Sequence, residues 1–142
     1  MTTVEDRTER RVKNRAAQVA AAFGVLCGVG WYSKFAVLSA TDGAGSGLVG
    51  TLWAVGMLSF LAAAAATTVA LLRGRRVALR IIAAVVAVPI AFTLFNILGG
   101  VTKSIYDGDA WFHDETELLV TGAVTALLGI VWLMRDRDYS VS

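Results

Sequence analysis

Long stretches without an ionisable residue alternate along this chain with short charged clusters. No Asp, Glu, Lys, Arg or His occurs in four windows of 18, 30, 22 and 17 residues, at 16–33, 43–72, 81–102 and 118–134. The hydrocarbon core of a bilayer needs about 20 helical residues to cross it, and a helix satisfies its own backbone hydrogen bonds inside lipid. The pattern predicts four transmembrane helices near 16–38, 48–72, 78–101 and 116–134.

Two other interpretations of these windows fit less well. A β-barrel needs short segments of alternating polarity, and runs such as Ala62 to Ala66 do not alternate. A cleaved signal peptide needs a small-x-small site after its apolar run, whereas the first run ends in Trp31, Tyr32 and Lys34. The expected fold class is therefore an all-α integral membrane protein, a four-transmembrane-helix bundle of two antiparallel hairpins.

Composition supports the membrane assignment. The chain has 142 residues, of which 56% are hydrophobic and 17% charged, whereas soluble domains carry about 25% charged residues. The single cysteine, Cys27, excludes a disulfide framework and a metal site built only of cysteines. Outside the spans no segment is long enough to fold alone.

The distribution of basic residues predicts the orientation. The N-terminal tail, the 73–80 turn and the C-terminal tail hold ten arginines and Lys13, while the opposite loops hold only Lys34 and Lys103. The positive-inside rule then places both termini in the cytoplasm. The expected layout is a basic tail at 1–15, a four-helix transmembrane domain at 16–134 and a second tail at 135–142. The Arg-rich, Ala-rich composition favours a bacterial inner membrane.

Small residues recur at close-packing spacing on the first and fourth spans. They are Gly24 and Gly28 on the first, and Gly122, Ala126 and Gly129 on the fourth. In lipid, small residues let helix backbones approach and gain dispersion contacts. These residues are candidates for helix packing, either within one bundle or between copies.

The third span is the least regular. Pro89 should kink it, and Thr93 and Asn96 follow on one face. Asn96 is costly in lipid unless it finds a hydrogen-bond partner, which Thr121 or Thr125 of the fourth span could supply. The two hypotheses are a polar clamp between helices and a polar path or pocket at the kink.

The outer segment 107–117 combines acids with His113, the one histidine of the chain. His113, Glu117 and Asp109 are candidate ligands for zinc or another divalent transition ion. The competing hypothesis needs no metal. In it, Asp114 is the N-cap of the fourth helix and Glu117 completes a capping-box-like pattern.

These observations lead to three functional hypotheses. The chain lacks the sequence motifs of the common soluble enzymes, such as GxSxG, a P-loop, CxxC or HExxH. We expect a non-catalytic accessory or packing subunit of a bacterial membrane complex, with no cofactor. The alternatives are a small transporter or channel with a polar path around Pro89, Thr93 and Asn96, and an outward-facing metal-binding membrane protein. The expected partners are the lipid bilayer and other membrane subunits or a second copy. Acids interleaved in the basic tail favour lipid headgroups over nucleic acid.

Overall fold

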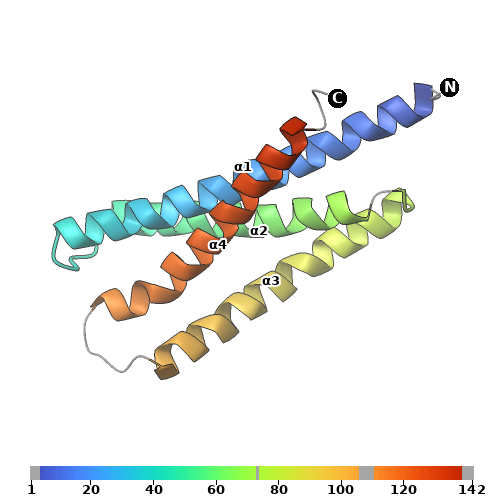
Figure 1. Cartoon of the computed structure of the whole chain (residues 1–142). Coiled ribbons are helices and arrows are strands. Elements are labelled where there is room, and N and C mark those ends of the chain that lie inside the picture. The colour runs from blue at the N-terminus through green and yellow to red at the C-terminus, as the bar shows by residue number, and fades with distance from the viewer. Residues whose placement is uncertain (1–3, 73, 106–110, 139–142) are drawn as a thin grey trace.

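The computed structural model describes residues 4–72, 74–105 and 111–138, and within them the side chains of 15–72, 74–105, 111 and 115–134. This part of the chain is all-helical, with α1 Val4–Ala40, α2 Gly47–Leu71, α3 Val77–Ile105 and α4 Trp111–Asp138 (Figure 1). Each helix contains a stretch long and apolar enough to cross a membrane. The prediction of four membrane-spanning helices is confirmed at this level, and the apolar stretches begin and end within four residues of the predicted spans.

The four helices pack unequally. α1 lies against both α2 and α4, whereas α3 packs mainly on α2 and touches α4 less (Figure 1). Buried residues make up 44% of the most apolar stretch of α1 and only 11% of that of α3. α1 is therefore the central helix, and α3 exposes most of its surface.

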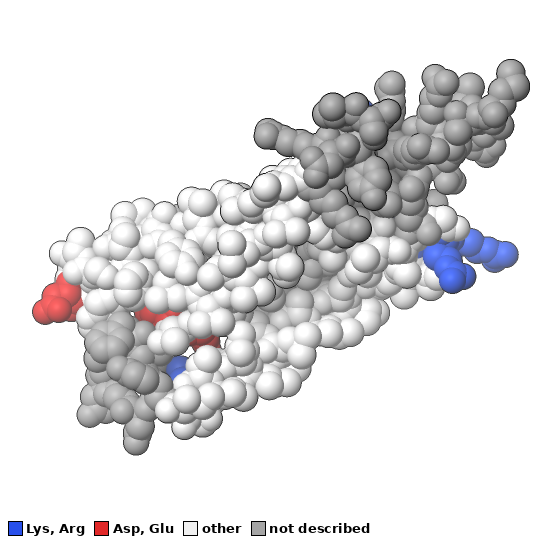
Figure 2. All heavy atoms as spheres, in the orientation of Figure 1, with Lys and Arg blue, Asp and Glu red and all other residues white. Residues whose placement is uncertain are grey.

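Most charged side chains of the described residues lie near the two ends of the molecule. Arg75 and Arg76 are exposed in the α2–α3 connection, and Asp42 is exposed in the α1–α2 turn. Figure 2 shows only basic groups coloured at one end, acidic groups with a basic group among them at the other, and an uncharged middle. The uncharged middle matches the requirement of a hydrocarbon layer.

The α1–α2 turn is built by local chemistry. Asp42 and Gly43 have φ values of 50° and 80°, and the Gly43 amide donates to the Leu38 carbonyl at 2.8 Å. The hydroxyl of Ser46 caps α2 by accepting from the Val49 amide at 3.4 Å. A positive φ just after a helix lets the following backbone amides donate to the last carbonyls of that helix. The turn therefore reverses the chain within a few residues.

Two helices begin well before the spans that the sequence predicted. α1 begins at Val4, so the segment predicted as a tail continues the first helix. α4 begins at Trp111, so Asp114 lies inside its first turn and is not the N-cap. The capping prediction was wrong because the helix starts four residues earlier than an N-cap at Asp114 requires, and its N-cap falls outside the described residues.

An aromatic cluster forms the core. Trp31 is 1% exposed and packs beside Phe60 and Phe95, with ring centroids 5.9 and 5.5 Å away. The indole lies directly over Gly56, where a Cβ atom would collide with it, and next to Gly122. Glycine at these positions lets one large side chain of α1 fill the space between α2 and α4.

Candidate functional site

The small residues predicted to pack helices come together between α1 and α4. A side chain on Gly24 would meet the Thr125 carbonyl oxygen at 2.8 Å, and one on Gly129 would meet the Ala21 carbonyl oxygen at 2.7 Å. Gly28 faces both Gly122 and Ala126. Within one molecule these residues therefore form a close seam between α1 and α4. Tyr32 adds a hydrogen bond across it to the Leu119 carbonyl at 3.2 Å.

The polar residues of α3 do not form the expected clamp. The Asn96 amide donates to the Phe92 carbonyl at 2.7 Å, and the Thr93 hydroxyl donates to the Pro89 carbonyl at 2.8 Å. Both side chains are exposed on the surface of the bundle. α3 continues through Pro89 as one helix. Asn96 thus bonds to its own helix, and neither Thr121 nor Thr125 of α4 is its partner.

The two threonines of α4 differ in how their hydroxyls are satisfied. The Thr125 hydroxyl donates to the Thr121 carbonyl at 2.5 Å. The Thr121 hydroxyl is buried and has no hydrogen-bond partner among the described residues. Thr121 is 8% exposed, and the indole nitrogen of Trp31 is likewise buried without a hydrogen-bond partner among the described residues.

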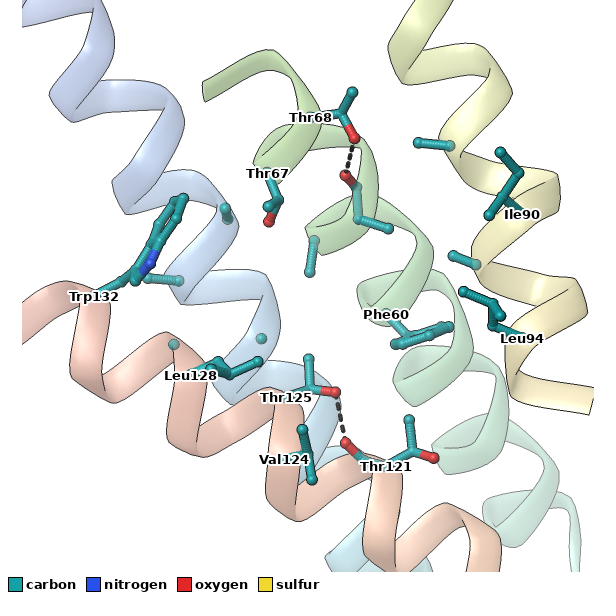
Figure 3. A pocket seen from close by; sticks show the side chains of 18 of the residues that line it. Phe60, Thr67, Thr68, Ile90, Leu94, Thr121, Val124, Thr125, Leu128 and Trp132 are labelled. Carbon is teal, nitrogen blue, oxygen red and sulfur yellow. Dashed lines mark hydrogen bonds between the residues drawn. The ribbon is translucent and has the colours of Figure 1, made fainter. Parts of the chain in front are cut away.

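A cavity of about 760 Å³ lies beside Thr121, lined by all four helices and open to the surroundings of the bundle, because lining residues such as Ile90 and Leu128 are exposed. We call it the central cavity. α3 contributes Ala87, Ile90 and Leu94, and α4 contributes Thr121, Leu128 and Trp132. Figure 3 shows Ile90 and Leu94 of α3 on one side of the cavity and Thr121, Leu128 and Trp132 of α4 on the other, with Phe60, Thr67 and Thr68 of α2 between them. Pro89, Thr93 and Asn96 are not among the lining residues.

An ion pair joins α1 to α4 near the end that carries Asp42. Both carboxylate oxygens of Glu115 lie 2.6 Å from the Lys34 ammonium nitrogen. The side chains are only 9% and 14% exposed. Glu115 is thus the partner of Lys34 among the described side chains. The pair is largely buried between α1 and α4.

Two further close contacts involve the N-terminal end of α4, which carries Glu115. The Glu117 carboxylate lies directly on Gly99 of α3, where a Cβ atom would overlap it. The Trp111 ring lies against Gly43, and its centroid is 5.6 Å from that of Phe35. Glycine thus permits contact from the α1–α2 turn and from α3.

The metal hypothesis falls mostly on residues whose side chains are not described. Asp109 and the side chains of His113 and Asp114 lie outside the described residues. Among the side chains that are described, no group of three or more His, Cys, Asp or Glu residues could hold a metal ion. Glu117, the described member of the proposed ligand set, contacts Gly99.

Sequence reasoning missed the central cavity and the pairing of Lys34 with Glu115. The cavity has no sequence signal because it arises from the way α3 separates from α4. Lys34 and Glu115 are 81 residues apart, so only the docking of α1 on α4 brings them together. Comparison with known proteins adds nothing to this geometry: no family model, curated protein or solved structure matches the chain.

Proposed function

We propose that this chain is a non-catalytic accessory or packing subunit of a bacterial membrane complex and that it associates through the outward face of α3. Its termini lie in the cytoplasm in this proposal, because the basic residues favour that side. The observation that carries the proposal is the position of Asn96. Its carboxamide is exposed on the apolar stretch of α3.

An exposed carboxamide at this depth favours a protein neighbour over lipid. Asn96 precedes the end of α3, Ile105, by nine residues, which is about 13 Å of helix. Its amide group already donates to Phe92, but the carboxamide as a whole remains in contact with the surroundings of the bundle. Asn is among the side chains that hydrogen-bond between helices in membranes, so a second helix is the favoured neighbour.

The residues around Asn96 suit a close helix contact. Pro89, Thr93 and Gly100 are exposed on α3 as well, and nothing lies within 4 Å of where a Gly100 side chain would be. With Asn96 they follow roughly one helical face, which we call the outer α3 face. Small residues beside a hydrogen-bonding side chain are typical of helix–helix interfaces in membranes.

The transporter alternative loses support from the same geometry. A polar path through the protein needs its polar side chains to line a cavity or a gap between helices. Thr93 and Asn96 are instead exposed, and the residues that line the central cavity do not include them.

The test is purification in a mild detergent, with mass spectrometry of what copurifies. We expect a stoichiometric partner, either another membrane protein or a second copy. Asn96→Leu should weaken the association about threefold to twentyfold, because interhelical hydrogen bonds in membranes contribute about 0.6 and at most about 1.7 kcal/mol.

Thr51→Val is the matched control. Thr51 is also exposed, lies on α2 and donates to its own helix, at 2.9 Å from the Gly47 carbonyl. Its replacement should leave the association unchanged. If Asn96→Leu and Thr51→Val copurify the same partner in the same yield, or if neither the wild type nor the variants associate with any protein, the proposal is wrong.

A further inference from the structure

Two arginines lie one helical turn apart at the start of α3, and we call them the arginine pair. The Arg80 amide donates to the Arg76 carbonyl at 3.2 Å. Arg76 is exposed and Arg80 is half-buried. Like charges spaced i, i+4 destabilise a helix, and cations near a helix N-terminus oppose its dipole. The arginine pair therefore lowers the stability of α3 unless an anion neutralises it.

The described part of the protein supplies no anion to this pair. Its acidic side chains are those of Asp42, Glu115 and Glu117. Asp42 lies in the α1–α2 turn and the other two lie near the start of α4, at the opposite end of the molecule from the α2–α3 connection (Figure 2). Neither arginine forms an ion pair or a side-chain hydrogen bond with another described residue. The counter-charge must therefore come from outside the described residues.

The depth of the arginine pair matches the headgroup layer of a bilayer. The apolar stretch of α2 ends at Leu71 and that of α3 begins at Val77, so Arg76 lies in the connection between two spans. Arg80 follows Val77 by three residues, or about 4.5 Å of helix. A long arginine side chain that starts at this depth extends its charged end to the interface. Both guanidinium groups thus reach the level at which lipid phosphates lie.

The guanidinium of Arg80 keeps its outer nitrogens for a ligand. Its Nε is buried and has no hydrogen-bond partner among the described residues, so this atom takes no part in binding. The two terminal nitrogens are not buried in this way, and the side chain as a whole is partly exposed. Terminal guanidinium nitrogens donate paired hydrogen bonds to phosphate oxygens. Side chains one turn apart start about 5–6 Å from each other, so the pair can hold one phosphate between them.

We propose that Arg76 and Arg80 bind the phosphate of an anionic phospholipid beside the α2–α3 connection. A lipid is favoured over free phosphate because the pair adjoins two spans, where headgroups are the nearest anions. An anionic headgroup is favoured over a zwitterionic one because the latter carries a cation that the pair repels. The site is separate from the outer α3 face, since Asn96 follows Arg80 by 16 residues, or about 24 Å of helix.

The experiment is native mass spectrometry of the full-length, delipidated protein in an uncharged detergent. Palmitoyl-oleoyl phosphatidylglycerol is titrated, and phosphatidylcholine with the same acyl chains is the matched ligand. We expect the first phosphatidylglycerol to bind about fivefold more tightly than the first phosphatidylcholine, or better, because one arginine near the surface favours an anionic lipid by about that factor.

Single substitutions test the two arginines. Arg76→Gln and Arg80→Gln should each raise the dissociation constant of phosphatidylglycerol about fivefold and leave that of phosphatidylcholine nearly unchanged. Arg80→Lys keeps the charge but loses the planar fork, so its affinity should fall between those of the wild type and Arg80→Gln. Arg15→Gln is the matched control, because Arg15 is also exposed and begins the apolar stretch of α1 at the same end of the molecule. It should change the dissociation constant less than about twofold.

Three results would overturn the proposal. Equal affinity for the two lipids would show that the protein binds acyl chains without regard to the headgroup. Losses in Arg76→Gln and Arg80→Gln no larger than that in Arg15→Gln would show that only the overall charge matters. Displacement of the lipid by inorganic phosphate at equal concentration would show that the ligand is a free anion. Asn96→Leu should leave the lipid titration unchanged, and Arg80→Gln should leave copurification of a protein partner unchanged, so failure here is distinct from failure of the subunit proposal.

Discussion

The ion pair between Lys34 and Glu115 should stabilise the fold far more than a surface pair does. At a nitrogen–oxygen distance of 2.6 Å, the Coulomb attraction is about 6 kcal/mol at an effective dielectric constant of about 20. Desolvation of both groups offsets much of this attraction. The side chains are 9% and 14% exposed, so removal of one partner leaves the other charge buried and uncompensated. Such a loss costs about 3–5 kcal/mol.

A double-mutant cycle measures this effect. Lys34→Met and Glu115→Leu should each lower the free energy of unfolding by about 3 kcal/mol. The double variant should be much more stable than the sum of the two losses implies, because apolar residues of similar size replace a buried pair at little cost. The assay is unfolding of the purified protein by increasing mole fractions of SDS in mixed micelles, followed by circular dichroism.

Arg75→Met is the control for loss of a charge. Arg75 is exposed at the opposite end of the molecule, and its replacement should change the free energy of unfolding by less than about 0.5 kcal/mol. The reasoning is refuted if each single variant loses less than about 1 kcal/mol and the losses add, since that is the behaviour of a solvated pair.

Two further predictions concern packing and topology. Gly56→Ala should destabilise the protein by about 1–3 kcal/mol because the added methyl meets the Trp31 indole. Gly50→Ala, which has open space around it, should be neutral or stabilising. Equal effects of the two substitutions in the SDS assay would contradict the close contact between Gly56 and Trp31. In a Cys27→Ala background, Ser46→Cys should react with an impermeant thiol reagent in whole cells and Ser142→Cys should not; labelling of Ser142→Cys would reverse the proposed orientation.

The charge pattern was enough to predict the helices, because a bilayer imposes one requirement on every span. An uncharged run such as 81–102 has few alternatives to a membrane helix. Helix ends were harder to predict. Asp114 looked like a cap, but α4 starts at Trp111, where tertiary contacts with Phe35 and Gly43 hold the first turn.

The arrangement of the candidate site depends on how the helices dock on one another, and the spacing of residues along the sequence does not determine this docking. The spacing of Gly24 and Gly28 indicated a surface of α1 for close packing, but it did not predict that α4 would cover this surface. Thr121 or Thr125 was a candidate hydrogen-bond partner for Asn96. The structure places Asn96 on the surface and Thr121 beside a cavity, because the rotation of α3 about its axis is determined by Phe95 and Gly99, which face the interior.

Site-directed photo-crosslinking in native membranes tests the role of the outer α3 face most directly. In a Cys27→Ala background, Gly100→Cys labelled with a benzophenone maleimide should give a discrete product containing a second copy or another membrane protein, and added Asn96→Leu should reduce its yield. Leu58→Cys, at a position of α2 that is 67% exposed, should give only lipid adducts. The same protein product from both sites, or none from Gly100→Cys, would contradict association through α3.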